Sequence, residues 1–317
     1  MTGGELAVAC LLDAAVGDPR WFPHPVRWMG LIVNWYDRRV QRLVLSPAKQ
    51  RMAGLLLAVI LPAGAYAAGS TLVWFGSAID PLCGSAVTVL LAWTSLAARD
   101  LIDHVASVQR ALRSVSLEEA RAAVAKIVGR DTEKMDEAEI VRATVETIAE
   151  STADGIMAPL FYLVLGGAPL ALAYKAVSTL DSMIGHLDDR YRWFGWASAR
   201  LDDAVNFIPA RITALLLVLS AGIVSRSWPV TQHAWRILLR DGRRHPSPNS
   251  GRPEAAMAGA LGVQLGGINL YDGLATERPC LGDANQPLTR AHIGKALTLM
   301  ISTSLTGVLL GVGWLLW

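Results

Sequence analysis

The sequence predicts an all-α, multi-pass integral membrane protein with about 4–5 transmembrane helices and helical cytoplasmic loops. Hydrophobic residues make up 52% of the 317 residues and charged residues only 18%, whereas charged residues make up about 25% of a soluble globular protein. Four apolar stretches approach or reach the roughly 17–25 residues of a membrane helix, at positions 52–75, 82–98, 212–224 and 296–317. Tryptophans, which prefer the headgroup level, lie at or near the ends of these stretches: Trp74, Trp93, Trp228, Trp314 and Trp317.

We predict a single membrane-embedded domain, residues 1–317, that contains two larger polar segments. Residues 99–155 are predicted to form amphipathic or soluble helices, and 225–295 a basic loop. Within that loop, 241–253 is rich in Gly and Pro and is predicted to lack regular structure. The apolar run 6–16 is interrupted by an acidic residue and follows no basic segment, so it predicts a short packed or interfacial helix rather than a cleavable signal. No β-strand is predicted anywhere.

A fifth apolar stretch, 156–174, leaves two topologies open. Its length suits a membrane span, but the segment from Gly166 to Pro169 is typical of a turn. If the stretch spans, the basic loop lies in the cytoplasm, as the positive-inside rule prefers, while the acid-rich segment 181–203 lies outside. If 156–185 forms a re-entrant hairpin instead, the acid-rich segment lies inside and the basic loop violates the rule.

An acidic stripe precedes this stretch. Glu146, Glu150 and Asp154 follow at intervals of four residues, which places them on one face of a helix. Each like-charge pair at this spacing costs about 0.2–0.5 kcal/mol in an isolated helix. The stripe is therefore either a solvated face, partly neutralised by Arg142, or a binding site for a cation or an amine.

Two further groups of charges lie in or after the apolar stretch. Lys175 and Asp181 are predicted either to take part in the chemistry, because ionisable groups near membrane depth are usually functional, or to form an interfacial pair. Asp202 and Asp203 follow Arg200. Adjacent carboxylates suit Mg²⁺, which takes one or two carboxylates together with waters and phosphate oxygens.

The segment 240–251 predicts an anion-binding loop. Its arginines can bind phosphate in a bidentate manner, and the backbone N–H groups of such turns form concave anion sites. The alternative is a basic loop at the headgroup surface. The candidate phosphate-binding residues are Arg240, Arg244, His245, Ser247, Asn249 and Ser250.

Composition and missing motifs exclude several classes of protein. The net charge of +2 gives no indication of nucleic-acid binding. Three dispersed cysteines, without a CxxC spacing, indicate neither a zinc site nor a disulfide framework. The absence of a GxxxxGK[ST] motif means that any use of ATP does not involve a P-loop.

The order of several long motifs resembles the adenosylcobinamide-phosphate synthase family of cobalamin biosynthesis, called CbiB or CobD. These motifs are GDP (17–19), PHPVR (23–27), ETIAESTADGIMAPLF (146–161), LGGAP (165–169), YKAVSTLDSM (174–183), FGWASARLDD (194–203), RHPSPNSG (244–251) and AGALGVQLGG (258–267). They extend over nearly the whole chain. The apolar region 52–98 matches the family only in character.

The resemblance implies a multi-pass enzyme of the cell (inner) membrane. It would join 1-amino-2-propanol, or its O-phosphate, to the free propionate of adenosylcobyric acid, with ATP as co-substrate and Mg²⁺. The expected partners are these substrates, the lipid membrane and other enzymes of the pathway, including a threonine-phosphate decarboxylase. The alternatives are a corrinoid transporter and a membrane scaffold for pathway enzymes.

Candidate roles follow from the chemistry of amide formation. We assign catalysis to Glu146, Glu150, Asp154, Lys175 and Asp181, and metal binding to Asp202 and Asp203. The loop 240–251 is assigned to substrate and phosphate binding. We also assign His24 and Arg27 to substrate and phosphate binding, because they lie in a family motif. Physical reasoning alone would place them only in a rigid turn.

Overall fold

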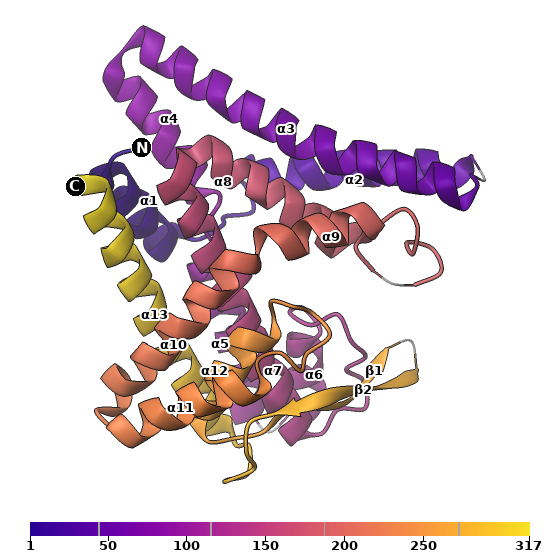
Figure 1. Ribbon diagram of the computed structural model, residues 1–317, viewed down its shortest axis with the longest axis vertical. Helices are drawn as coiled ribbons and strands as arrows, with labels where there is room; N and C mark the ends of the chain where they lie inside the picture. The colour runs from indigo at the N-terminus through magenta and orange to yellow at the C-terminus, as the bar shows by residue number, and fades with distance from the viewer. Residues whose placement is uncertain (44, 115, 187, 272) are drawn as a thin grey trace. The chain divides into compact units, whose positions relative to one another are not determined.

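A computed structural model describes residues 1–43, 45–114, 116–186, 188–271 and 273–317. Nearly all of the regular structure is helical (Figure 1). The first half contains α1 Gly3–Val16, α2 Pro25–Arg42, α3 Pro47–Ile79, α4 Pro81–Trp93, α5 Ala98–Arg113, α6 Leu117–Val124, α7 Glu137–Ser151 and the π-helix η1 Thr152–Met157. The second half contains α8 Ala158–Ile184, α9 Trp196–Val205, α10 Phe207–Ser225, α11 Trp228–Asp241, α12 Gly251–Leu261, β1 Leu265–Tyr271, β2 Leu274–Leu281 and α13 Arg290–Leu316.

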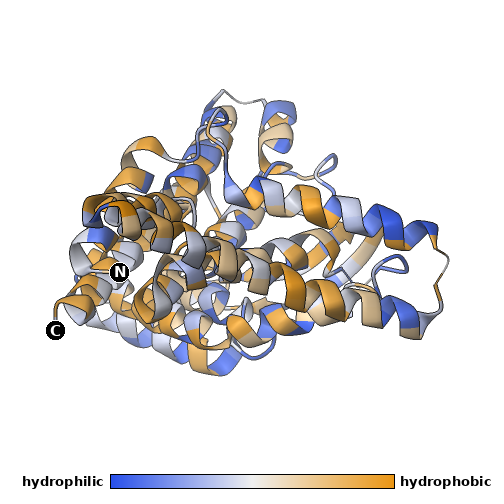
Figure 2. Ribbon diagram, turned by 90° about the horizontal axis from the view of Figure 1, so that it is seen from above, coloured by the Kyte–Doolittle hydropathy of each residue, from blue (hydrophilic) through white to orange (hydrophobic). Residues whose placement is uncertain are grey.

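The helices confirm the predicted fold class. Among the described residues, five helical segments are long and apolar enough to cross a membrane: Pro47–Ile79, Pro81–Arg113, Glu137–Ile184, Phe207–Ser225 and Arg290–Leu316. Each contains one of the apolar stretches found in the sequence. Figure 2 shows hydrophilic residues gathered where α2 ends and α3 begins, beside long apolar runs on the helices.

The chain divides into two compact units, which are described separately. Unit 1 comprises residues 1–97, 158–206 and 308–317. Its core gathers apolar side chains from α2, α3 and α8 around Phe194, which is fully buried. Gly54 on α3 permits this packing, because a Cβ there would lie 1.9 Å from the carbonyl oxygen of Phe194.

Unit 1 also contains the stretch whose topology the sequence left open. The helical φ/ψ pattern of α8 is broken at Gly166 and Gly167, where Gly167 adopts a φ of 71°. This left-handed conformation favours glycine because it has no Cβ. The chain changes direction at the break (Figure 1), which is where the sequence indicated a turn.

Unit 2 comprises residues 98–157 and 207–307. Its core joins the apolar faces of α5, α7, α10, α12 and α13. The small residues of α12 allow close packing: a Cβ on Gly259 would lie 2.7 Å from the Cα of Ala234 on α11.

Two predictions about the basic loop were wrong. β1 and β2 form an antiparallel hairpin, although no strand was predicted. Two glycines with positive φ, Gly266 and Gly267, begin β1, and Arg142 donates hydrogen bonds to the carbonyl groups of Gly266 and Ile268. The hairpin is thus stabilised by a distant arginine that local patterns do not reveal.

The second error concerns 241–253, which is not a loop throughout. The helix α12 begins at Gly251 and includes Pro253 in its first turn. Proline is tolerated there because the first N–H groups of a helix have no partner within the helix. The irregular part is limited to residues 242–250.

Candidate functional site

The side chain of Glu146 is the buried end of the acidic stripe. The apolar face of α7 packs into the core of unit 2 and carries Glu146 inward, to 8% exposure. One carboxylate oxygen accepts the N–H of Gly266 at 2.8 Å, and the other accepts from Arg130. The Nη1 atom of Arg142 lies 4.0 Å from the same carboxylate. Glu146 therefore ties α7 to the first residues of the hairpin.

Glu150, one turn further along α7, is exposed and meets the basic loop. Its Oε1 atom accepts a hydrogen bond from Ser250 Oγ at 3.0 Å. Ser247 Oγ accepts the N–H groups of Asn249 and Ser250, each at 3.2 Å, and so fixes the turn that presents Ser250. The acidic stripe and the loop 240–251 meet at this contact, which joins residues 100 positions apart.

A third glutamate, Glu254, completes the cluster. It lies in the first turn of α12 and is 4% exposed. Burial raises the pKa of its carboxyl group well above the usual value, and the charges of Glu150 and Glu146 raise it further. Glu254 thus retains a proton at pH values at which an ordinary glutamate has lost it. We call Glu146, Glu150 and Glu254 the glutamate cluster.

His245 supports the turn beside this cluster. Its Nδ1 atom accepts the N–H of Ser247 at 3.0 Å, and its Nε2 atom lies 3.2 Å from Nη1 of Arg278. Burial lowers the pKa of the imidazole to about 4, and the positive charge of Arg278 acts in the same direction. The ring is therefore neutral near pH 7, and its contacts position the loop.

Asp154 does not continue the stripe at a regular α-helical interval. It lies in η1, a π-helical turn that follows α7 directly. Because a π-helix contains more residues per turn than an α-helix, the interval of four residues no longer repeats the direction of Glu146 and Glu150. Such π-helical insertions are frequent at functional sites.

Arg240 and Arg244 contact a buried carboxylate of their own segment. Asp241 is 0% exposed and accepts hydrogen bonds from Arg240 Nε and Nη2, at 2.9 and 2.7 Å. Arg244 Nη1 lies 3.2 Å from the same carboxylate, and the N–H of Gly282 donates to it at 2.9 Å. Burial acts to raise the pKa of Asp241, but the hydrogen bonds from Arg240 and Gly282 outweigh it and the pKa falls below its ordinary value.

His24 and Arg27 lie in unit 1 and organise the turn that precedes α2. Arg27 donates to Asp18 Oδ1 at 2.8 Å and to the carbonyl oxygen of Arg20 at 2.7 Å. His24 is the N-cap of α2, with its Nδ1 atom 3.3 Å from the N–H of Val26. These contacts agree with the rigid turn that physical reasoning alone indicates.

The remaining predicted residues also lie in unit 1. Lys175 and Asp181 are both on α8. On α9, Asp202 Oδ2 accepts from the Asn206 amide at 3.0 Å, and Asp203 lies 3.7 Å from Arg200. Burial raises the pKa of Asp203, and the charge of Arg200 opposes this shift.

The chemistry of Asp202 and Asp203 suits Mg²⁺. No group of three or more His, Cys, Asp or Glu side chains that could hold a metal ion occurs in the described part of the chain. Mg²⁺ is usually held by only one or two carboxylates plus waters and substrate phosphates. A pair of aspartates beside an amide therefore matches the donor set of a magnesium–nucleotide complex better than that of a metal bound by protein alone.

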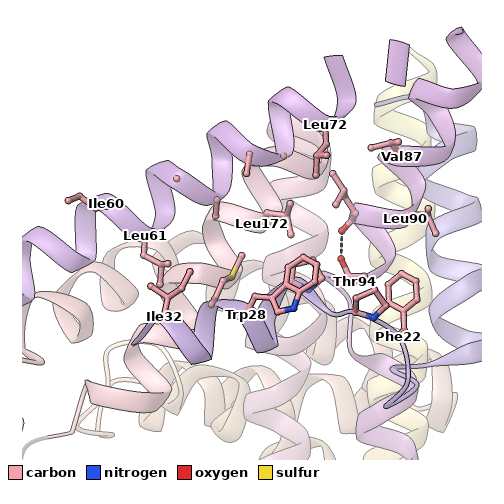
Figure 3. A pocket seen from close by; sticks show the side chains of 18 of the residues that line it. Phe22, Trp28, Ile32, Ile60, Leu61, Leu72, Val87, Leu90, Thr94 and Leu172 are labelled. Atoms are coloured by element: carbon pink, nitrogen blue, oxygen red, sulfur yellow. Dashed lines mark hydrogen bonds between the residues drawn. The ribbon is translucent and has the colours of Figure 1, made fainter. Parts of the chain in front are cut away.

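An apolar cavity of about 670 Å³ lies between α2, α3, α4 and α8 of unit 1. Figure 3 shows Trp28, Leu61, Leu172 and Leu90 along its walls. Thr94 carries the one side-chain hydroxyl among its lining residues, and this hydroxyl donates to the carbonyl of Leu91 at 2.9 Å. The cavity suits an apolar occupant, not a phosphate or an ammonium group.

Sequence reasoning missed several members of the site in unit 2. Glu254 could have been found from the sequence, because it is the one acidic residue in the segment of mostly small residues between Gly251 and Gly262. Arg130 and Arg278 gave no signal, since they lie far along the chain from the residues that they contact. Arg278, on β2, contacts His245 in the turn that precedes α12, and Arg130 joins Glu146 to Asn269.

The fold and the site define a polytopic helical membrane protein with a buried polar cluster in which carboxyl groups, arginines and hydroxyls lie side by side. The model of the CobD/Cbib protein family matches residues 6–300. A cobalamin biosynthesis protein CobD from Geobacter metallireducens is 49% identical over 97% of this chain and 95% of its own length. A cobalamin biosynthesis protein CbiB from Salmonella typhimurium is 42% identical over 92% and 91%, respectively.

This chain belongs to the CobD/CbiB family and has a role in cobalamin biosynthesis. The resemblance found in the sequence motifs is thereby confirmed. No solved structure matches the chain.

Proposed function

We propose that this protein forms an amide between the free propionate of adenosylcobyric acid and the amine of 1-amino-2-propanol or its O-phosphate, with Mg-ATP as co-substrate. The observation that carries the proposal is the hydrogen bond between Glu150 and Ser250, 3.0 Å long, in a cluster with Glu254, whose pKa is raised by burial. This arrangement offers a carboxylate that can bind an amine, next to the hydroxyl groups of Ser247 and Ser250. Membership of the CobD/CbiB family supports the corrinoid as the other reactant.

The reaction requires activation of the carboxylate, because a carboxylate and an amine do not condense in water. Attack of the propionate oxygen on the γ-phosphorus of ATP gives an acyl phosphate and ADP. The neutral amine then attacks the acyl carbon, the C–N bond forms, and inorganic phosphate leaves with the electron pair of the C–O bond. Asp202 and Asp203 would hold Mg²⁺, which would neutralise charge on the nucleotide phosphates.

Glu150 receives the ammonium group of the amine and accepts the proton that must leave before attack. A positioned general base of this kind contributes about 10²–10⁴-fold to a rate. Ser250 orients the Glu150 carboxylate through their hydrogen bond. Because the pKa of Glu254 is raised and the Glu146 carboxylate is paired with Arg130, Glu150 is the carboxylate of the cluster that would receive the proton of the amine.

The test is a ligation assay with the purified full-length protein in detergent. Adenosylcobyric acid, 1-amino-2-propanol O-phosphate and Mg-ATP are expected to yield ADP, inorganic phosphate and an amidated corrinoid in equal amounts. A transporter or a scaffold would produce none of these. Corrinoid uptake into vesicles without any amide product would contradict the proposal and favour the transporter, for which Lys175 and Asp181 are candidate residues.

A further inference from the structure

Three arginines of unit 2 gather near the start of α12. Arg211 lies in the first turn of α10, Arg243 in the turn after α11, and Arg252 in the first turn of α12. The helices α10 and α12 pack together, and a Cβ on Gly242 would lie 3.6 Å from the Cα of Arg252. Arg252 and Arg243 are the charged neighbours of Arg211. We call these residues the arginine triad.

The triad differs from the other arginines of the same loop in what balances its charge. Arg240 and Arg244 pair with Asp241. Within the part of the chain that the structure describes, no ion pair includes a member of the triad. Arg211 instead donates to the carbonyl of Phe207 and places its guanidinium 3.3 Å from the centroid of the Phe207 ring.

One donor of the triad is both buried and unsatisfied. The Nε atom of Arg252 is shielded from solvent and has no hydrogen-bond partner among the described residues. Burial and the charge of Arg243 both lower the pKa of Arg252, which is the expected effect of placing cations together without an anion. Buried donors in native proteins are nearly always paired, so the Nε atom of Arg252 is available to an acceptor from outside the chain.

The start of α12 adds to the positive potential. Its N-cap residue, Ser250, makes no side-chain capping bond to the helix, because its hydroxyl is directed to Glu150. The dipole of a helix N-terminus favours an anion. The planar guanidinium group of arginine binds two oxygen atoms of a phosphate or a carboxylate at once.

We propose that Arg211, Arg243 and Arg252 form the subsite that binds the phosphate group of the amine substrate. The inference rests on the proposed function and assigns residues that the sequence motifs did not. Ser250 links the two ends of the substrate site, because it contacts Glu150 and precedes Arg252 by two residues. A short molecule with an ammonium group at one end and a phosphate at the other therefore suits this stretch of the protein.

The experiment measures binding of 1-amino-2-propanol O-phosphate and of the free amine to the full-length protein in a neutral detergent, by calorimetry. Arg252→Gln and Arg243→Gln are expected to weaken binding of the phosphate ester by about 10- to 100-fold, as the loss of a charge-assisted hydrogen bond does, and to leave binding of the free amine unchanged. Arg236→Gln is the matched control, since Arg236 is an exposed arginine of α11 outside the triad. Arg252→Lys, which keeps the charge without the fork, should bind with intermediate affinity and guards against misfolding of the Gln variant.

An anionic lipid headgroup offers the same chemistry, so a second arm tests it. Phosphatidylglycerol that copurifies with each variant is measured by mass spectrometry. Loss of this lipid from the triad variants, with unchanged binding of the phosphate ester, would overturn the proposal in favour of a lipid site. Equal binding of the ester by wild type and both Gln variants would also overturn it.

The outcome is separable from that of the proposed function. If the wild-type protein makes the amide and the triad variants keep its Michaelis constant for the ester, the triad assignment fails while the ligase assignment stands. If the ester binds in a triad-dependent manner but Mg-ATP and adenosylcobyric acid yield no amide, the subsite stands and the ligase assignment fails.

Discussion

Unit 2 contains two buried carboxyl groups whose surroundings have opposite electrical character. Asp241 is 0% exposed and is surrounded by Arg240, Arg244 and the N–H of Gly282. Glu254 is 4% exposed, and the charges of Glu150 and Glu146 act on it more strongly than those of Arg278 and Arg130. Burial acts to raise both pKa values, yet the pKa of Asp241 falls and that of Glu254 rises.

The difference shows that burial alone does not decide what a carboxyl group does. A carboxylate whose lone pairs are all matched by donors stabilises the fold, as Asp241 does. A carboxyl group kept beside like charges costs stability, and such costs are typical of sites retained for function. The comparison therefore separates a structural centre from a reactive one within the same unit.

The largest expected effect is on catalysis. Glu150→Gln should lower amide formation by about 10²–10⁴-fold, because the general base is lost. Thermal stability should be unchanged or slightly higher, since the change removes the like-charge repulsion between Glu150 and Glu146. A ligation assay and a melt in detergent, on the same preparation, measure both. Retained activity would contradict the catalytic assignment, and a much lower melting temperature would show that Glu150 is structural.

The second effect concerns the structural carboxylate. Asp241→Ala removes the buried acceptor of the Gly282 N–H and one of the two acidic partners of Arg240, and should reduce the free energy of unfolding by about 1–3 kcal/mol. Denaturation in detergent measures the loss. Asp283→Ala provides the control, because Asp283 also pairs with Arg240, at 2.8 Å, but is partly exposed, so the expected loss is at most about 1 kcal/mol. Equal losses of unfolding free energy for the two variants would show that the buried Asp241 is no more important for the fold than the partly exposed Asp283.

The third effect is a pH dependence of stability. The raised pKa of Glu254 means that the folded state holds a proton which the unfolded state releases above about pH 4.5. Its contribution to stability is therefore full at lower pH and is lost as the pH rises through the folded-state pKa, by up to about 1.4 kcal/mol per pH unit. His245, with a pKa lowered to about 4, acts in the opposite direction, but only between about pH 4 and 6.5.

A comparison of wild type with Glu254→Gln above pH 4.5 separates the contribution of Glu254 from those of other groups. The melting temperature of the wild type should fall more steeply with rising pH than that of Glu254→Gln, which cannot release a proton. Glu277→Gln, at an exposed position of β2, should keep the wild-type slope. Parallel curves for wild type and Glu254→Gln would show that Glu254 is not protonated in the folded protein.

The smallest expected effect is that of Arg244→Gln. Arg244 is half-exposed, so loss of its contact with Asp241 should reduce stability by about 1 kcal/mol or less and leave the Michaelis constant for the phosphate ester unchanged. The Michaelis constant of Arg244→Gln is compared with that of Asn249→Ala, since Asn249 is buried in the turn that presents Ser250. A rise of tenfold or more in the constant for Arg244→Gln would restore the sequence-based assignment of Arg244 to the phosphate site and count against the arginine triad.

The sequence by itself determined the features that depend on local composition. The apolar runs predicted the spanning helices because the hydrocarbon core of a bilayer sets a minimum length for any helix that crosses it. The glycines at 166 and 167 indicated the break in α8, because few other residues accept a φ of 71°. The long motifs identified the family, and they marked Glu146, Glu150 and the loop 244–251 before any contact between them was known.

Only the tertiary structure decided which charges balance one another. Glu150 meets Ser250, Arg130 meets Glu146, and Arg142 supports a hairpin that was not predicted. Each of these contacts joins residues 16 to 126 positions apart, a distance over which sequence periodicity carries no information. The energy of a charge depends on the groups within a few ångströms of it, and the folded chain alone brings those groups together.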